Sequence, residues 1–227
     1  IFQMNSSNNW RSILTSIQTL LPESEGFECY PFRVGAYNDA VSAHFKFDYD
    51  DRTMAVLVLS TPKMFEGGFK KWLRSKKLPG ESVDDLSEKI LMCTCGHVAG
   101  AAFYLRPQLV SNVPDDIEAI FPQKPEKPII GVSLHPKYGG HFAFRAVLIF
   151  KDVELPEDFV EKSPRNPLAG KSAMEELLIL FNLHWKDGRF RDCGDPIERY
   201  SDLQLSYFAK PPAERWDVIK HWFREEN

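Results

Sequence analysis

The first apolar pattern in the chain has helical spacing. Apolar side chains recur every three or four positions and stop before Pro22; they belong to Trp10, Ile13, Leu14, Ile17 and Leu20. This spacing predicts an amphipathic helix over residues 10–21. Residues 1–9, IFQMNSSNN, are mostly polar and are expected to be a disordered terminus or an expression-derived extension.

Two strands are predicted next. The run MAVLVLS (54–60) is apolar almost throughout, which favours a strand covered on both faces. The run FECYPFRV (27–34) is typical of an irregular strand, which Pro31 is expected to interrupt.

Two helices are predicted to follow. Ser60 or Thr61 is suited to cap a helix that has Pro62 in its first turn and runs to about Lys77. A second helix is predicted over 89–106, because the apolar positions fit a helical period better than strict alternation. These positions are Ile90, Leu91, Val98, Ala102 and Leu105.

The clearest supersecondary signal is a β-hairpin. It consists of IIGVSLHP (129–136), the turn KYGG (137–140) and HFAFRAVLIF (141–150). Proline-rich loops are predicted on either side of it, over 111–128 and 156–169.

Three more helices are predicted, over 173–185, 201–208 and 212–223. Helices mixed with strands in this order, with an antiparallel hairpin, indicate an α+β sandwich of sheet and helices. No sharp break in composition divides the chain, so residues 1–227 are expected to form a single domain.

Composition narrows the class of protein. The 227 residues carry a net charge of −4, which gives no reason to expect a nucleic-acid partner. Four cysteines, Cys29, Cys93, Cys95 and Cys193, fit a reducing compartment better than a disulfide framework. The longest apolar run is too short to span a membrane and no signal peptide is recognisable. A soluble cytoplasmic protein is therefore expected.

The stretch CTCGHVAGAAFY (93–104) holds the most distinctive chemistry. On a helix Cys93 and His97 share a face, whereas Cys95 points away from both. Structural zinc usually takes ligands in CxxC-type pairs, and there is no second pair, so no metal site is predicted. A Cys–His nucleophile pair and buried side chains that only pack are the alternatives. The glycines and alanines allow close approach by another helix or by a broad, flat ligand.

Several arginines are not obviously accounted for by contacts with their neighbours. Arg145 interrupts an apolar strand, Arg191 lies among aromatic residues, and Arg215 stands in the first turn of a predicted helix, where a cation is disfavoured. Structural ion pairs or solvated turns would explain them. Guanidinium groups also bind carboxylates bidentately, so a small anionic ligand is the alternative.

Several long segments together resemble the methylmalonic aciduria and homocystinuria type C family of cobalamin-processing proteins. The resemblance covers most of the chain in unbroken order. It is carried by FECYPFRV (27–34), LVLSTPKMF (57–65), HVAGAAFY (97–104), IIGVSLHPKYGGHFAFRAV (129–147), FNLHWKDGRFRD (181–192) and ERYSDLQLSYFAKPPAER (198–215).

The resemblance implies a fold like that of the flavin nitroreductases and cobalamin held base-off in a large cavity. It implies two activities: reductive decyanation of cyanocobalamin with reduced flavin (FMN or FAD, with NADP as a linked cofactor) and dealkylation of alkylcobalamins by glutathione. A chaperone role is implied as well, with a cblD-type trafficking protein and the methionine synthase system as partners. The protein is expected to be a monomer or a ligand-dependent homodimer.

The resemblance also implies site residues. His97 is placed near the cobalt face, and Arg145, Arg191 and Arg215 match the family's glutathione-binding arginines. The cobalamin-binding positions are Ile90, Leu91, Met92, Cys93, His97, Tyr104, Leu105, Arg106, Ser133 and Phe144. Cys93 and Cys95 depart from the family pattern, which weakens the metal and nucleophile interpretations.

A second departure concerns the connection 78–89. The family has a longer stretch there that includes a strand, so either this chain lacks it or the numbering crosses an unseen loop. A non-catalytic cobalamin carrier is the alternative function, and a plain flavin nitroreductase is a more remote one.

Overall fold

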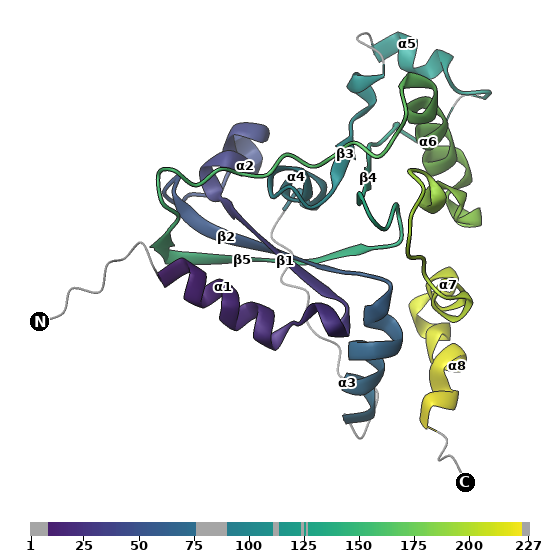
Figure 1. Cartoon of the computed structure of the whole chain (residues 1–227). Coiled ribbons are helices and arrows are strands. Elements are labelled where there is room, and N and C mark those ends of the chain that lie inside the picture. The colour runs from purple at the N-terminus through teal and green to yellow at the C-terminus, as the bar shows by residue number, and fades with distance from the viewer. Residues whose placement is uncertain (1–8, 76–89, 111–113, 124, 126, 224–227) are drawn as a thin grey trace, which may run out of the picture.

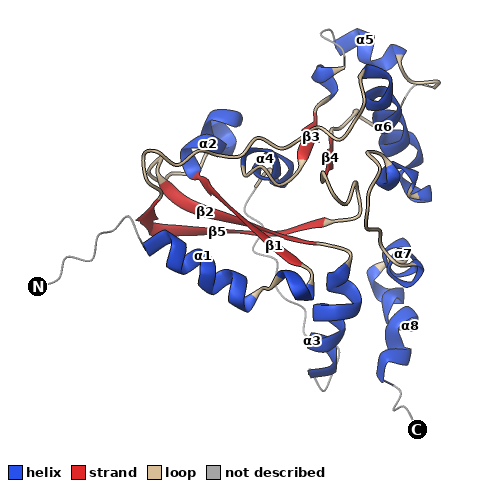
Figure 2. Ribbon diagram, in the orientation of Figure 1, coloured by secondary structure: helices blue, strands red, loops and turns tan. Residues whose placement is uncertain are grey.

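The computed structural model describes residues 9–75, 90–110, 114–123, 125 and 127–223 (Figure 1). In this part of the chain helices surround a three-stranded and a two-stranded sheet (Figure 2). The strands are β1 (Phe27–Arg33), β2 (Thr53–Ser60), β3 (Phe103–Leu105), β4 (Val132–Leu134) and β5 (Ala143–Glu154). The α-helices are α1 (Asn9–Leu20), α2 (Val34–Ala40), α3 (Lys70–Ser75), α4 (Met92–Val98), α5 (Pro114–Ala119), α6 (Lys171–His184), α7 (Asp202–Ala209) and α8 (Arg215–Ile219).

Shorter helical turns connect these elements. A π-helical turn, Phe65–Phe69, leads directly into α3. The 3-10 turns are Glu23–Glu25, Ala43–Phe45, Pro107–Leu109, Trp185–Asp187, Arg189–Asp192, Pro212–Glu214 and Lys220–Phe223.

The larger sheet is antiparallel, in the order β1-β2-β5, and every residue of its central strand β2 is buried. Helix α1 covers one face, where Ile17 shares a core with Met54 and Val56 of β2. Helices α2 and α4 lie over the opposite face (Figure 1), where Leu57 shares a core with Tyr37. Because side chains alternate along a strand, an apolar run such as β2 supplies both cores.

The smaller sheet pairs β3 with β4 and packs against α6. Leu105 of β3, Leu134 of β4 and Leu177 of α6 are all completely buried in this second core. Helices α6, α7 and α8 follow one another along one side of the molecule (Figure 1).

Much of the predicted order of elements is confirmed. α1, β2, α6 and α7 lie where the apolar patterns predict them, and residues 212–223 form α8 between two 3-10 turns. The predicted loop over 156–169 has no helix or strand. Ser201 caps α7 by accepting a hydrogen bond from the Gln204 N–H at 3.2 Å. The mixture of helices with antiparallel sheets confirms the α+β class.

Two local predictions near the larger sheet are wrong. Pro31 does not interrupt its strand: β1 is continuous and pairs Pro31 with Val56. Since β1 is paired on only one side among the described residues, a missing N–H is tolerated there. The predicted cap before the following helix is also absent, because Ser60 Oγ accepts from Arg145 Nε and Thr61 Oγ1 is buried without a described partner.

The predicted hairpin over 129–150 does not form. β4 pairs with β3 and β5 pairs with β2, so the two strands belong to different sheets. The turn between them closes through the pair His135–Gly139, whose two backbone hydrogen bonds are 2.8 and 2.9 Å long. The sequence pattern is the same whether such strands pair with each other or with different neighbours.

The predicted helix over 89–106 is also wrong beyond its first part, because α4 ends at Val98 and β3 follows. Gly100, with φ +74°, ends the helix in the left-handed conformation. Its N–H donates to His97 O at 3.1 Å, and the Ala101 N–H donates to Gly96 O at 2.9 Å. These two bonds form the Schellman arrangement that commonly terminates helices at glycine.

The remaining differences fall on the connections. Residues 114–119, predicted as loop, form α5, which begins at Pro114, a residue suited to a first helical turn. Residues 1–8 and the connection 78–89 lie outside the described residues.

Candidate functional site

The three predicted anion-binding arginines gather around two tyrosines. Arg145 lies on β5, Arg191 in the 3-10 turn before α7, and Arg215 at the start of α8. Tyr200 and Tyr207 lie between them in the sequence. We call these five residues the arginine–tyrosine cluster.

The tyrosine rings hold two of the guanidinium groups directly. The Arg191 guanidinium lies 5.3 Å from the Tyr200 ring centre, and the Arg215 guanidinium lies 5.3 Å from that of Tyr207. Arg145 is close enough to both tyrosines to interact with them electrostatically. Tyr200 is buried, and burial raises the pKa of its hydroxyl to about 12, so it stays protonated.

Arg145 owes its position to a β-bulge. Leu59 of β2 lies opposite Phe144, but the preceding residue Val58 lies opposite Ala146, so Arg145 has no partner on β2. Such an extra residue redirects its side chain out of the regular alternation of the strand. Arg145 is exposed, and its Nε donates to Ser60 Oγ at 2.7 Å.

None of the three arginines has a carboxylate partner among the described residues. Arg191 donates to the Gly140 carbonyl at 2.7 Å and Arg215 to the Lys210 carbonyl at 3.0 Å. By contrast, Arg33 and Arg199 are each paired with an acid. Guanidinium groups that bind only neutral oxygens and rings retain N–H donors and a full positive charge for an anionic ligand.

His97 occupies a different part of the structure, on α4 beside β3. Its Nδ1 accepts the Tyr104 backbone N–H at 3.2 Å, which leaves Nε2 to carry the proton. Partial burial lowers the pKa of His97, and nearby Arg106 lowers it further. His97 is therefore a neutral imidazole whose Nε2–H makes no hydrogen bond with the described residues.

The two cysteines near His97 are not activated. Burial raises the pKa of Cys93, an effect that the neighbouring Ser133 hydroxyl opposes, and burial raises that of Cys95 to about 12. Thiols with raised pKa values are poor nucleophiles at neutral pH, which argues against the Cys–His pair. No three His, Cys, Asp or Glu side chains of the described residues lie together as a metal site would require.

The predicted cobalamin positions divide into two groups. His97, Cys93, Tyr104 and Ser133 come together, because Tyr104 of β3 pairs with Ser133 of β4 beside α4. Ser133 Oγ is buried next to the Cys93 thiol.

The other predicted positions are less favourable. Leu105 is completely buried in the core around α6 and is not accessible. Arg106 is exposed, 5.5 Å from the Tyr104 ring centre. Leu91 is exposed, whereas Ile90 and Met92 are half-buried against the core above the larger sheet.

The small residues of α4 and the following turn pack against protein. A Cβ atom on Gly96 would lie 2.5 Å from the Phe144 ring, so Phe144 fills the space that the glycine leaves. Ala99, Ala101 and Ala102 are buried in the core. Phe144 and the core therefore make the close approach that these small residues allow, and the small residues do not form an open face.

Tyr200 and Tyr207 were not identified as site residues from the sequence. Both fall in ERYSDLQLSYF (198–208), where tyrosines beside a capped helix look like ordinary core residues. Tyr200 and Tyr207, two and nine residues after Glu198, give no local signal that they meet arginines from β5, the 189–192 turn and α8.

Comparison with known proteins identifies the family. The model of the methylmalonic aciduria and homocystinuria type C family matches residues 26–88 and 81–219. The "MMACHC-like protein" of Caenorhabditis elegans is 40% identical over 255 residues, covering 93% of each chain. A human protein named "Cyanocobalamin reductase / alkylcobalamin dealkylase" is 34% identical over 86% of this chain and 76% of its own, and the Gallus gallus protein of that name is 38% identical over 86% and 90%.

A solved structure agrees over nearly the whole chain. The crystal structure of a B12-trafficking protein, CblC, from C. elegans superposes with a TM-score of 0.81 at 38% identity, covering 96% of this chain and 98% of that one. The 255-residue alignment with the nematode sequence is longer than this chain of 227 residues, so that relative has residues without a counterpart here. None of the described helices is long and apolar enough to cross a membrane. The chain belongs to the methylmalonic aciduria and homocystinuria type C family.

Proposed function

We propose that this chain is a cobalamin-processing enzyme that removes the upper axial ligand of vitamin B12. It would act by reductive decyanation of cyanocobalamin and by glutathione-dependent dealkylation of alkylcobalamins. Relatives over most of the chain carry the names of these two activities. The observation that carries the dealkylase assignment is the gathering of Arg145, Arg191 and Arg215 without carboxylate partners among the described residues.

Glutathione has two carboxylates, and forked guanidinium donors bind carboxylates bidentately. Once held, its thiolate attacks the carbon bound to cobalt. A C–S bond forms, the Co–C bond breaks, and its electron pair stays on cobalt to give cob(I)alamin. The proton of the thiol is lost to solvent. This step requires positioning more than an acid or base on the protein.

Cobalamin itself is proposed to bind base-off beside α4, with the macrocycle near His97, Tyr104 and Ser133. The neutral His97 Nε2–H and the Ser133 hydroxyl are suited to donate hydrogen bonds to its polar substituents. Phe144 fills the space against Gly96, so binding beside α4 would involve movement of that ring or contact with it.

Reduced flavin, FMN or FAD, would supply the electrons for decyanation. Of two hollows of about 580 and 420 Å³, the first is lined by Gln123, Lys127 and residues 182–187, and the second by residues 167–169, 189 and 192–195 with three residues of α6. Neither is lined by His97 or by a residue of the arginine–tyrosine cluster. These hollows do not fit a flavin that must reach the cobalt of a cobalamin bound near His97, so no described residue is assigned to flavin binding. A nitroreductase-like fold, a cytoplasmic location, and transfer of cobalamin to a cblD-type protein and the methionine synthase system are parts of the same proposal.

The dealkylase assignment is tested by removing each arginine of the cluster in turn. Arg145→Ala, Arg191→Ala and Arg215→Ala should each raise the glutathione concentration for half-maximal dealkylation of methylcobalamin by roughly 10- to 100-fold, since a charged hydrogen bond contributes about 1.5–3 kcal/mol. Decyanation uses no glutathione and should change much less. Arg199→Ala, which removes a guanidinium paired with Asp192, is the control.

Normal dealkylation by all three variants at low glutathione would show that these arginines are structural. Arg145 lies in a bulge of β5, so a melting curve must accompany its variant. The alternative function, a non-catalytic carrier, predicts that the unsubstituted protein binds methylcobalamin and leaves its methyl group in place when glutathione is added.

A further inference from the structure

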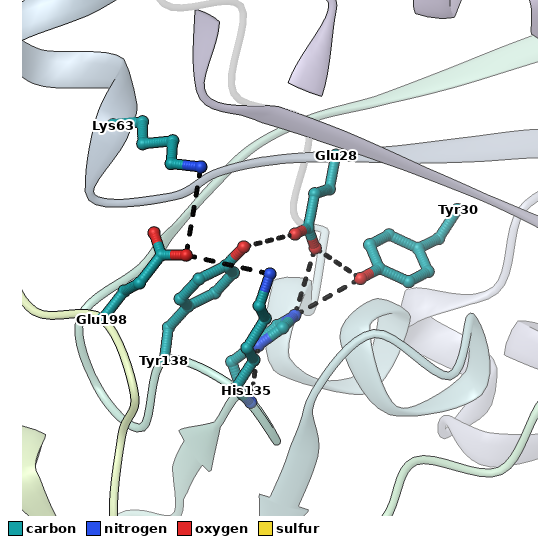
Figure 3. A network of polar contacts seen from close by, with 7 residues as sticks. Glu28, Tyr30, Lys63, His135, Tyr138 and Glu198 are labelled. Carbon is teal, nitrogen blue, oxygen red and sulfur yellow. Dashed lines mark hydrogen bonds and ion pairs between the residues drawn. The ribbon is translucent and has the colours of Figure 1, made fainter. Parts of the chain in front are cut away.

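A largely buried polar network lies between β1 and the turn that joins β4 to β5 (Figure 3). Glu28 of β1 accepts hydrogen bonds from the Tyr30 hydroxyl at 2.5 Å and the Tyr138 hydroxyl at 2.8 Å. His135 Nε2 lies 3.2 Å from the same carboxylate. We call Glu28, Tyr30, His135 and Tyr138 the Glu28 network.

Glu28 is ionised, and its partners in the network are oriented toward its carboxylate. Burial raises the pKa of Glu28, but the hydrogen bonds from His135, Tyr30 and Tyr138 outweigh it and lower that pKa to about 2. His135 Nδ1 accepts the Lys137 N–H at 3.1 Å, so the ring directs its Nε2 proton at the carboxylate. The His135 and Tyr138 rings also stack, with their centres 4.5 Å apart.

Two of the donors, His135 and Tyr138, belong to the turn itself. Both side chains are about 95% buried, and both point at Glu28 (Figure 3). The turn is closed by the backbone pair of His135 with Gly139. Glu28 therefore fixes the turn to β1 from one side.

The other side of the turn contacts Arg191. The Gly140 N–H donates to Arg191 O at 2.9 Å, and Arg191 Nη1 donates back to Gly140 O at 2.7 Å. A Cβ on Gly139 would lie 2.5 Å from Arg191 O, and one on Gly140 would lie 2.8 Å from Arg191 Cα. This close approach ties the position of the guanidinium to that of the turn.

The turn also contacts the segment that leads to Tyr200. The Ile197 N–H donates to Lys137 O at 3.0 Å, and Glu198 lies 3.8 Å from the Lys137 ammonium. Glu198 also lies 3.9 Å from the ammonium of Lys63 (Figure 3). Movement of the turn would thus displace both Arg191 and the ring against which its guanidinium lies.

We propose that Glu28 is a positioning residue for glutathione: by holding the turn through His135 and Tyr138, it fixes the Gly140 carbonyl that orients Arg191. This inference rests on the proposed function, because it takes Arg191 to bind a glutathione carboxylate. Glu28 does not touch the ligand. It acts on the apparent affinity for glutathione and leaves cobalamin binding and the bond-breaking step unaffected.

The test compares Glu28→Gln with Glu161→Gln. Glu161 is a matched control, since its side chain is 17% exposed against 15% for Glu28, and it also binds a residue of β1, Arg33, but not the turn. Dealkylation of methylcobalamin is measured against glutathione concentration. Glu28→Gln should raise the glutathione KM by roughly three- to tenfold, less than loss of the guanidinium itself, with kcat and the rate of decyanation unchanged. Glu161→Gln should leave the KM unchanged.

Tyr138→Phe provides a second, milder variant should Glu28→Gln not fold. It removes one hydrogen bond between Glu28 and the turn while keeping the stacked ring, and it should raise the glutathione KM in the same direction by a smaller factor. An unchanged KM in the folded variants, alongside a raised KM in Arg191→Ala, would overturn the positioning role alone. Equal increases in Glu28→Gln and Glu161→Gln would also overturn it. An unchanged KM in Arg191→Ala would refute the arginine clamp, and the positioning role with it.

Discussion

The ionised Glu28 should make the stability of the fold depend on pH. Its pKa falls from 4.5 to about 2 on folding, and this difference corresponds to about 3 kcal/mol of stabilisation, fully present above pH 5. A carboxylate whose pKa is lowered by folding loses its stabilisation as the pH falls through its folded-state pKa. By pH 3 more than half of the contribution should be gone.

Replacing Glu28 by glutamine removes this contribution and keeps the shape of the side chain. At pH 7 the free energy of unfolding should fall by about 2–3 kcal/mol. For 227 residues an unfolding entropy of roughly 0.5 kcal/mol/K converts this into a loss of about 4–6 °C in Tm. The difference between the two proteins should shrink steadily from pH 5 to pH 3.

Urea denaturation followed by circular dichroism at several pH values measures this difference. Glu157→Gln is the control: that side chain is 88% exposed and its ion pair with Arg52 spans 3.4 Å, so its loss should change stability by less than about 1 kcal/mol. The reasoning would be refuted if Glu28→Gln were as stable as the unsubstituted protein at pH 7, or if its deficit were the same at pH 3 as at pH 7.

Two further predictions concern α4. Gly96→Ala should lower the free energy of unfolding, measured by urea denaturation, by about 1–3 kcal/mol, because its Cβ would meet the Phe144 ring. Adding Phe144→Ala should relieve this clash, and the control Gly67→Ala should show no such clash because its Cβ meets nothing closer than 3.7 Å. An unchanged stability of Gly96→Ala would disprove the tight packing. His97→Ala should bind cobalamin more weakly in an absorbance titration and lose only about 1 kcal/mol of stability, the value of its hydrogen bond from the Tyr104 N–H. Unchanged affinity with a large loss of stability would instead make His97 a core residue.

Elements with strong local patterns could be predicted from the sequence. β2 is recognisable because its apolar residues are nearly continuous. The end of α4 had a signal in Gly100, but the alanines around it prolonged the helical pattern and concealed the stop.

The failures at the hairpin and around the site have a common physical cause. Whether β4 pairs with β5 depends on contacts made by residues far away in the sequence, among them Glu28 beneath the turn and Arg191 against it. Local alternation contains no information about such partners.

The same holds for the arginine–tyrosine cluster. The sequence shows the three arginines as charges in unfavourable places, but the bulge that redirects Arg145 depends on its register with β2. The tyrosines come from a segment whose local pattern predicts only a helix. Resemblance to the family supplied the assignment to glutathione, which composition and spacing left open.

The central claim is that this chain dealkylates cobalamin with glutathione, and anaerobic absorbance spectroscopy of the protein with methylcobalamin tests it most directly. Binding alone should shift the spectrum to the base-off form. Addition of glutathione should then convert that form into cob(I)alamin, with S-methylglutathione formed in equal amount. A base-off spectrum that persists unchanged in the presence of glutathione would contradict the account and identify the protein as a carrier.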